Sequence, residues 1–349
     1  MPLLTLTDRG LYCEPGDFFV DPWEPVDRAV ITHAHGDHAS GGSRAYLTSE
    51  PGVGVLRARL EPNARIRGVL YGEPLSLNGV TISLHPAGHI LGSSQVRIVH
   101  RGEVWVVSGD YKTAPDPTCT PFEPVRCHTF ITESTFGLPI YRWPPQAEVF
   151  EEINNWWRVN ASAGKTSMLY GYTLGKAQRL IAGLDPTVGP ILTHGAVERM
   201  TAAYRDAGVL LPPTRYAGTA ERRNDATGAV VIAPPYASAS PWTRRFGSQS
   251  TGFASGWMLV RGARRRRSLD RGFPLSDHVD WPSLLAAIEA TGASEVWVTH
   301  GFTGPVVRWL TERGLDARAV QTRFEGERDD EVIEGVEEET AGQANGLGR

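Results

Sequence analysis

Four side chains of types that commonly bind metal ions lie within six positions, directly after the apolar run 29–31, in the pattern His-x-His-x-Asp-His. Alternation along an extended segment places His33 and His35 on one side of the chain, where both can bind one ion. Asp37 and His38 come next and suit a second ion. Imidazole nitrogens favour Zn or Mn, and carboxylates also accept harder cations. We therefore predict two divalent metal ions, Zn or Mn.

Further candidate ligands lie far along the chain, each at the exit of a short β-rich run. Loops at the ends of packed strands hold side chains in register, and the sites of α/β proteins are often built there. We therefore expect these exits to converge on the His-x-His-x-Asp-His motif. The exits are His89 after residues 80–85, Asp110 after 104–108, Glu133 after 130–132 and His300 after 296–299.

Each of these residues can be given a role in a centre with two metal ions. His89 can supply a third nitrogen to the first ion, Asp110 can bridge both ions, and His300 can complete the second. Two ions lower the pKa of a shared water to near neutrality and stabilise the negative charge that builds on a phosphorane or tetrahedral centre. The motif therefore predicts hydrolysis by a metal-bound hydroxide, with Asp37 as a catalytic residue.

His278 is the candidate general acid, because an imidazolium near neutral pH is suited to protonating a leaving oxygen. Glu133 can hydrogen-bond its other nitrogen and keep the ring cationic. The alternative is that Glu133 and His278 form a structural pair at a domain junction. We predict the catalytic role, since the two residues flank the same middle segment of the chain.

Taken together, these motifs resemble the metallo-β-lactamase superfamily. Two further motifs are more specific, because they resemble those that open and close the β-CASP insertion of nucleic-acid-cutting members. The superfamily motifs are residues 33–38, 88–89, 108–110 and 299–301, and the insertion motifs are residues 132–137 and 276–280.

The resemblance implies an α/β fold, with an αββα sandwich formed by residues 1–138 and 272–324 and an α/β β-CASP domain inserted at 139–271. The middle of the chain indicates such a unit independently, because strand-like and helix-like segments alternate there, which is typical of a parallel sheet. The strand-like segments are 166–170, 191–193 and 229–233, and the helix-like segments are 176–182 and 197–206.

Residues 256–273 resemble the run before the closing histidine in bacterial ligase-associated DNA exonucleases. That resemblance implies phosphodiester hydrolysis of DNA in repair, with an ATP-dependent DNA ligase and a helicase as partners. His300 points the other way, because the RNA-cleaving branch has a histidine at this motif and the eukaryotic crosslink-repair nucleases typically lack one. An RNA-processing nuclease therefore stays an alternative, beside a small-molecule thioester or lactam hydrolase and an inactive scaffold subunit.

Several residues are candidates for binding phosphate. Thr173, Gly175 and Lys176 precede a predicted helix, where backbone N–H groups and the helix dipole attract anions, although such a loop can also be a simple turn. Ser134 and Thr135 are further donors. The arginine run is Arg264, Arg265, Arg266 and Arg267, which offers several phosphate contacts if it is not merely a solvated face.

Rings and cations alternate at Trp242, Arg244, Arg245 and Phe246, as they do in platforms on which single strands stack. His194, followed by glycine like His300, lies inside the predicted insertion, and we interpret it as a loop residue.

The composition predicts a cytoplasmic protein with no membrane segment. Three cysteines in 349 residues, without a Cys-x-x-Cys pair, favour free thiols in a reducing compartment. The net charge is −4, but residues 325–349 carry nine acidic residues and two arginines. That tail contributes −7 and leaves +3 for residues 1–324, so we predict a mildly basic body and a disordered acidic end.

Overall fold

The computed structural model describes residues 2–219, 226–260 and 269–323. The chain divides into two compact units. The first unit comprises Met1–Pro115, Thr120–Ile140 and the chain from Val279 onward, and the second comprises Asp116–Cys119 and Tyr141–His278.

The first unit contains two β-sheets. The first sheet has the order β1-β2-β3-β4-β5-β6, and the second has the order β19-β18-β11-β10-β9-β8-β7. The first sheet consists of β1 (Thr5–Thr7), β2 (Gly10–Cys13), β3 (Phe18–Val20), β4 (Ala29–Val30), β5 (Tyr46–Ser49) and β6 (Ile66–Val69). The second consists of β7 (Leu75–Leu77), β8 (Val80–Pro86), β9 (Ser94–His100), β10 (Glu103–Val107), β11 (Thr129–Thr132), β18 (Glu295–Val298) and β19 (Asp316–Ala319).

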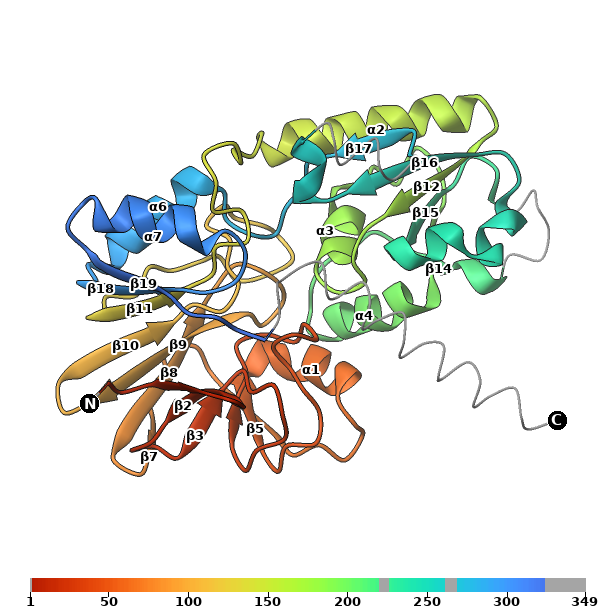
Figure 1. Ribbon diagram of the computed structural model, residues 1–349. Helices are drawn as coiled ribbons and strands as arrows, with labels where there is room; N and C mark the ends of the chain where they lie inside the picture. Colours follow the sequence, from red (N-terminus) through yellow and green to blue (C-terminus); the bar gives the residue numbers. More distant parts are fainter. Residues whose placement is uncertain (1, 220–225, 261–268, 324–349) are drawn as a thin grey trace. The chain divides into compact units, whose positions relative to one another are not determined.

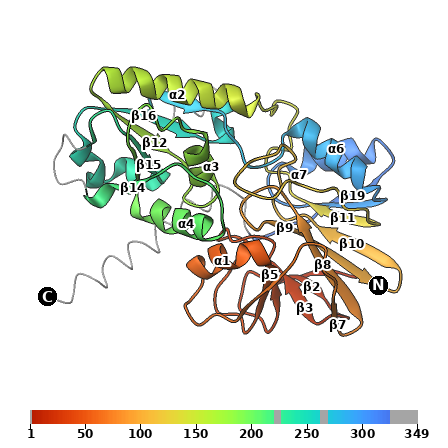
Figure 2. The ribbon, with the colours of Figure 1, turned by 180° about the vertical axis from the view of Figure 1, so that it is seen from behind.

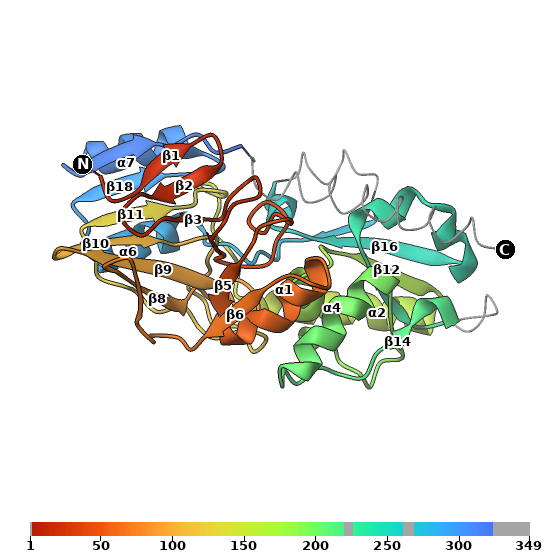
Figure 3. The ribbon, with the colours of Figure 1, turned by 90° about the horizontal axis from the view of Figure 1, so that it is seen from below.

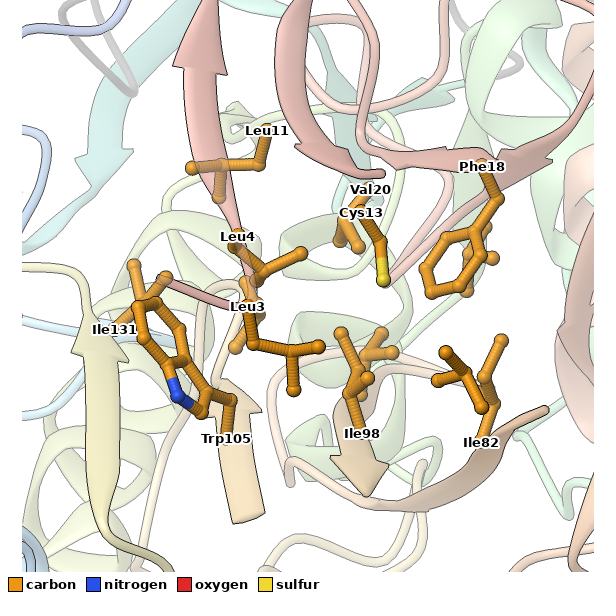
Figure 4. Packing of buried hydrophobic residues seen from close by; sticks show 14 of the residues in the cluster. Leu3, Leu4, Leu11, Cys13, Phe18, Val20, Ile82, Ile98, Trp105 and Ile131 are labelled. Atoms are coloured by element: carbon orange, nitrogen blue, oxygen red, sulfur yellow. The ribbon is translucent and has the colours of Figure 1, made fainter. Parts of the chain in front are cut away.

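The two sheets pack face to face around one apolar core (Figure 1). Most of the strands contribute alternate side chains to this core, as expected for strands that are buried on one face. Figure 4 shows Leu11, Phe18 and Val20 of the first sheet opposite Ile82 and Ile98 of the second. Figure 3 looks onto the first sheet, with β1, β2 and β3 side by side.

Helices α6 (Trp281–Thr291) and α7 (Thr303–Thr311) cover the other face of the second sheet. Their apolar residues pack against side chains of β10, β11 and β18 that point away from the first sheet. Helix α6 has clear sequence signals at both ends, since the Asp280 side chain accepts the Ser283 N–H and Gly292 ends it in a left-handed conformation. Helix α1 (Val53–Arg59), after the 3₁₀ turn η1 (Glu50–Gly52), lies beside β6.

The second unit is built on a six-stranded sheet in which all neighbouring strands are parallel. Its order is β14-β13-β15-β12-β16-β17 (Figure 2). The strands are β12 (Thr166–Tyr170), β13 (Ile191–Thr193), β14 (Arg215–Tyr216), β15 (Val230–Ala233), β16 (Gln249–Ala254) and β17 (Arg271–Phe273).

The two faces of this sheet are covered by different elements. Helices α2 (Gln146–Ser162), α3 (Lys176–Gly183) and α4 (Gly195–Asp206) pack on one face. Short 3₁₀ helices cover the other, and Trp156 and Trp157 anchor α2 to the sheet. Among the residues of this unit that the structure describes, the 3₁₀ helices include η2 (Ala217–Thr219), η4 (Pro235–Ala239), η5 (Pro241–Phe246) and η6 (Gly256–Leu259).

The fold is thus a mixed α/β fold with several sheets, as predicted. The predicted parallel unit in the middle of the chain is confirmed, with strand 166–170 found as β12 and the helix expected at 176–182 found as α3. In the part of the chain that the structure describes, no helix has both the length and the apolar character that crossing a membrane requires.

Candidate metal centre

The first unit brings together three histidines and a carboxylate from three different loops. His35 Nδ1 lies 3.1 Å from His33 Nε2 and 3.1 Å from His89 Nε2. Asp110 Oδ2 lies 3.6 Å from the same nitrogen of His33 and 3.9 Å from that of His89. Donors bound tetrahedrally to one zinc ion lie about 3.3 Å from one another, so the spacing of these atoms fits a shared cation.

A second group of donors adjoins the first through the same carboxylate. Asp37, His38 and His300 offer ligand atoms within 4.8 Å of one another. His38 Nε2 lies 3.6 Å from Asp37 Oδ2 and 3.5 Å from Asp110 Oδ2. Asp110 Oδ2 therefore lies between a group of three imidazoles and a second group of two imidazoles and a carboxylate.

Most residues of the two donor groups are buried, yet some of their polar atoms have no hydrogen-bond partner among the described residues. Asp37 and His38 are each 3% exposed. Within the described residues, Asp37 Oδ1 and His38 Nε2 are buried without a hydrogen-bond partner. A buried polar atom left unpaired costs roughly 1–3 kcal/mol, and a cation bound by these atoms would offset that cost. The donor set therefore fits a pair of divalent ions.

The protonation of the imidazoles also suits metal binding. Burial lowers the pKa of His33 well below its usual value, with neighbouring His38 and His89 adding to the effect. Burial, again with His38, lowers the pKa of His300 to about 4. Both rings are therefore neutral near pH 7, which is the form that binds metal.

His38 differs from these two rings. Burial would lower its pKa, but the charges of Asp37 and Asp110 outweigh burial and raise the pKa well above its usual value. The ring therefore carries a proton among these carboxylates, and a cation bound there would displace that proton.

Asp21, which sequence reasoning did not identify, holds the second group in place. Its Oδ2 lies 2.8 Å from His38 Nδ1, and its carboxylate also accepts the backbone N–H and the hydroxyl of Thr32 at 2.8 and 2.6 Å. A carboxylate on the far nitrogen fixes the ring so that Nε2 faces the ion. Asp21 directly follows the apolar strand β3, so the rule used for the other strand exits would have found it.

The loop that carries His300 is held in an unusual conformation. His300 has a φ of +49°, in the left-handed region that side chains other than glycine rarely adopt. Gly301 has a φ of +71°, and a Cβ there would lie 2.4 Å from the Ser134 carbonyl oxygen. The Ser134 hydroxyl donates to the carbonyl oxygens of Thr299 and His300.

Ser134 and Thr135, which we predicted as phosphate donors, lie against this loop. The Ser134 hydroxyl stabilises the His300 loop, and both side chains are almost fully buried. The strained turn itself points to function, because such conformations persist only where the surrounding structure holds them.

Glu133 lies in the first unit, whereas His278 is the last residue of the second unit. Glu133 is buried, and its Oε1 accepts the backbone N–H of Tyr111 at 2.9 Å. The Tyr111 carbonyl in turn accepts the N–H of Val279, the residue that follows His278. In the second unit, His278 donates its N–H to the Ser276 hydroxyl and accepts the Trp143 indole N–H at its carbonyl.

The predicted phosphate loop before α3 uses its polar groups internally, which differs from the prediction. The Gly175 N–H donates to the Gln178 side chain at 2.8 Å, and the same side chain donates to the Thr173 carbonyl. Gly-x-x-Gln is the spacing of a capping box, in which the helix start is closed by its own third residue.

Lys176 is fully buried, and its ammonium group donates to the Asp277 carboxylate and the Leu275 carbonyl, which compensates for the loss of water. Arg179, one turn later, is paired with Asp116 at 3.2 Å and donates to the Ser276 carbonyl. Lys176 and Arg179 of α3 thus hold the segment that leads to His278. The Lys176 ammonium group is already paired with the Asp277 carboxylate inside the unit. The predicted contacts of Arg264–Arg267 lie outside the described residues.

Comparisons with known proteins find relatives but no matching family model. A probable DNA ligase of Opitutus terrae is 34% identical over 324 residues, which are 92% of this chain but 31% of that relative. An endoribonuclease YSH1 of Eremothecium gossypii is 26% identical over 165 residues, 47% of this chain and 20% of the relative.

An RNase J-like protein of Methanocaldococcus jannaschii is 22% identical over 233 residues, 57% of this chain and 54% of the relative. The chain thus spans from about a fifth to about half the length of these relatives. A solved structure of a protein of unknown function from Enterococcus faecalis matches with a TM-score of 0.55 at 12% identity, over 78% of this chain and 74% of that one. This last match shows a likeness of fold.

We predict that Asp21→Asn weakens binding of one of two metal ions about 10- to 100-fold, because the His38 ring loses its charged partner. Chelator competition followed by measurement of metal content gives the two affinities. Asp27→Asn is the matched control, since the Asp27 side chain is 83% exposed in the same unit. Equal affinities for both ions in the two variants would contradict the role given to Asp21.

We predict that Lys176→Met destabilises the protein by roughly 3–5 kcal/mol, because it leaves the buried Asp277 carboxylate without its cation. The double variant Lys176→Met/Asp277→Leu should recover most of that loss. Urea unfolding measures both. Asp185→Asn, which removes a partner of Arg158 at the surface, is the control and should change stability little. A single variant as stable as wild type would show that the pair is dispensable.

Proposed function

We propose that this protein is a two-metal phosphodiesterase that degrades DNA from an end during repair. The arrangement of Asp110 between two groups of metal donors carries this proposal, because neighbouring ions suit phosphodiester hydrolysis. When bound, the two ions would supply a water of lowered pKa and stabilise charge on the phosphate. His33, His35, His89 and Asp110 would hold one ion, and Asp37, His38, His300 and Asp110 the other.

We assign the chain to the metallo-β-lactamase superfamily, with the first unit as the sandwich and the second unit as a β-CASP domain. The boundary predicted at residue 272 shifts to Val279, because β17 pairs with β16 in the second unit. The motifs support this assignment, as do relatives named as endoribonuclease and RNase J-like. A superfamily member acting on a small thioester or lactam would need neither the second unit nor nuclease-like relatives. An inactive scaffold is disfavoured because every predicted ligand is present.

DNA is preferred as the substrate because the relative that covers 92% of this chain is named a probable DNA ligase. Nuclease and ligase activities on one polypeptide would trim and then seal a break, so we propose that a DNA ligase is a partner of this protein. A helicase partner rests on the family resemblance alone, and a cytoplasmic location rests on the composition of the sequence. RNA processing is the second candidate, favoured by the names of the endoribonuclease relatives.

The general acid in this proposal is His278, oriented by Glu133. Chain continuity supports it, because Val279 directly follows His278 and donates its backbone N–H to the Tyr111 carbonyl. The backbone N–H of Tyr111 in turn donates to the Glu133 carboxylate. An imidazolium there would protonate the leaving oxygen. Thr135, Thr173 and Arg264–Arg267 stay proposals for contacts with nucleic acid.

We expect the purified protein to shorten DNA strands labelled at the 5′ or the 3′ end in the presence of Mn or Zn, and to act weakly on matched RNA strands. Asp37→Ala should reduce cleavage at least ~100-fold, because a ligand of one ion is lost. Circular dichroism checks that the variant stays folded. Equal cleavage by Asp37→Ala would overturn the two-metal proposal, and a preference for RNA would favour the second candidate.

We expect His278→Ala to slow DNA cleavage about 10²- to 10⁴-fold without loss of metal. Hydrolysis of bis(4-nitrophenyl) phosphate should change far less, since its leaving group departs without protonation. His100→Ala, at a partly exposed position of the first unit, is the control. Equal losses on both substrates, or release of metal from the His278 variant, would rule out a general acid at this position.

A further inference from the structure

Aromatic side chains gather at one edge of the parallel sheet in the second unit. Strands β14, β13 and β15 are neighbours and run parallel, so their carboxyl ends meet at the same edge. Tyr216 is the last residue of β14, and His194 directly follows β13. Tyr236 lies in η4, three residues after β15 ends at Ala233. Three neighbouring strands therefore each deliver a ring to this edge.

The connections that follow β13 and β15 leave to opposite faces of the sheet. The connection after β13 enters α4, whose Val197 packs on the same face as Ile191. The connection after β15 enters η4 and η5, whose Ala237 and Phe246 pack on the opposite face. Where connections from adjacent parallel strands leave to opposite faces, a crevice forms outside their carboxyl ends, and open α/β sheets bind ligands there.

The rings at this edge are anchored in the core of the unit. The His194 and Trp242 rings are 4.8 Å apart at 75°, and the Trp242 and Phe246 rings are 4.8 Å apart at 72°. Phe246 is 2% exposed, whereas Trp242 and His194 are only partly buried. His194 Nδ1 also accepts the Ala196 N–H at 3.2 Å and caps α4. Trp242 is thus held rigidly, with part of its ring left accessible.

Tyr216 is the most exposed ring of this group, at 47%. A Cβ at Gly218 would lie 2.3 Å from its ring, and a Cβ at Gly195 would lie 3.4 Å from it. The ring therefore occupies space beside Gly218 that a Cβ there would fill, and it lies at ordinary contact distance from Gly195. Exposed aromatic side chains that gather in one place mark interaction surfaces, whereas scattered ones do not.

Cations accompany the exposed rings. Arg215 precedes Tyr216, and Arg244 and Arg245 follow Trp242; all three are exposed. The nearby carboxylate of Glu198 accepts from Thr214 and faces Arg205, so it is partly neutralised within the unit. Exposed rings interleaved with arginines bind single-stranded nucleic acid, because bases stack on the rings and phosphates contact the cations.

We propose that Tyr216, His194 and Trp242 form a stacking site for the bases of a single nucleic-acid strand, with Arg215, Arg244 and Arg245 contacting its phosphates. The inference rests on the proposed nuclease function, and it adds that the substrate is held as a single strand through its bases. Phe246 belongs to the support of this site rather than to its surface, which differs from the sequence-based prediction.

The test is binding of a fluorescein-labelled oligothymidylate, and of an abasic strand with the same number of phosphates, to the full chain in EDTA. Fluorescence anisotropy gives the dissociation constants. Tyr216→Ala and Trp242→Ala should each weaken oligothymidylate binding about 5- to 150-fold and leave abasic binding unchanged. Trp242→Phe should retain most of the affinity. Tyr12→Ala, a surface tyrosine of the first unit, should behave like wild type.

Equal losses on the two strands, or no loss on either, would overturn the stacking site. Cleavage of end-labelled DNA by the wild type separates this result from failure of the nuclease proposal. If the wild type binds through Tyr216 and Trp242 but never cleaves, the nuclease proposal fails and the stacking site stands. If cleavage is normal and Tyr216→Ala binds like wild type, only the stacking site fails.

Discussion

The buried carboxylate of Asp110, in reach of imidazoles on both sides, is the interaction on which the rest of the structure depends. It lies 3.6 Å from His33 and 3.5 Å from His38, two residues that belong to different donor groups. Donors gathered this densely away from water are unfavourable unless cations join them. The surrounding fold must therefore hold them against their own tendency to move apart or to become hydrated.

The packed sandwich of the first unit holds these donors in place. Two sheets share one core, and hydrogen bonds cross-link the loops that leave their strands. Asp21 links β3 to the motif through Thr32 and His38, and the Ser134 hydroxyl holds the loop of His300. His300 and Asp21 both adopt positive φ, so part of the packing energy maintains strained backbone at the candidate centre.

In the second unit, charge is used for position. Lys176 and Arg179 are buried beside Asp277 and Asp116, and they hold the segment that ends at His278. Burial would raise the pKa of Asp116, but Arg179 and hydrogen bonds from Thr118 and Gln146 lower it below its usual value, so the pair is ionised. The same sheet carries accessible aromatic rings at the carboxyl edge of β13 and β14. In our proposals, one unit therefore positions the general acid His278 and also binds the nucleic-acid strand.

The sequence by itself determined the donor set and most of the framework, because these depend on local patterns. His33 to His38, and the strand exits at His89, Asp110 and His300, could be read from spacing and from apolar runs, as could the parallel order of strand and helix in the second unit. Only the tertiary structure decided which polar groups are free. Lys176, Gly175 and Ser134 look like anion ligands in the sequence, but partners about 100 or more residues away, or a capping glutamine, occupy them. Long-range pairing of this kind leaves no local pattern, since any lysine at a helix start looks alike until the chain brings a buried carboxylate to it.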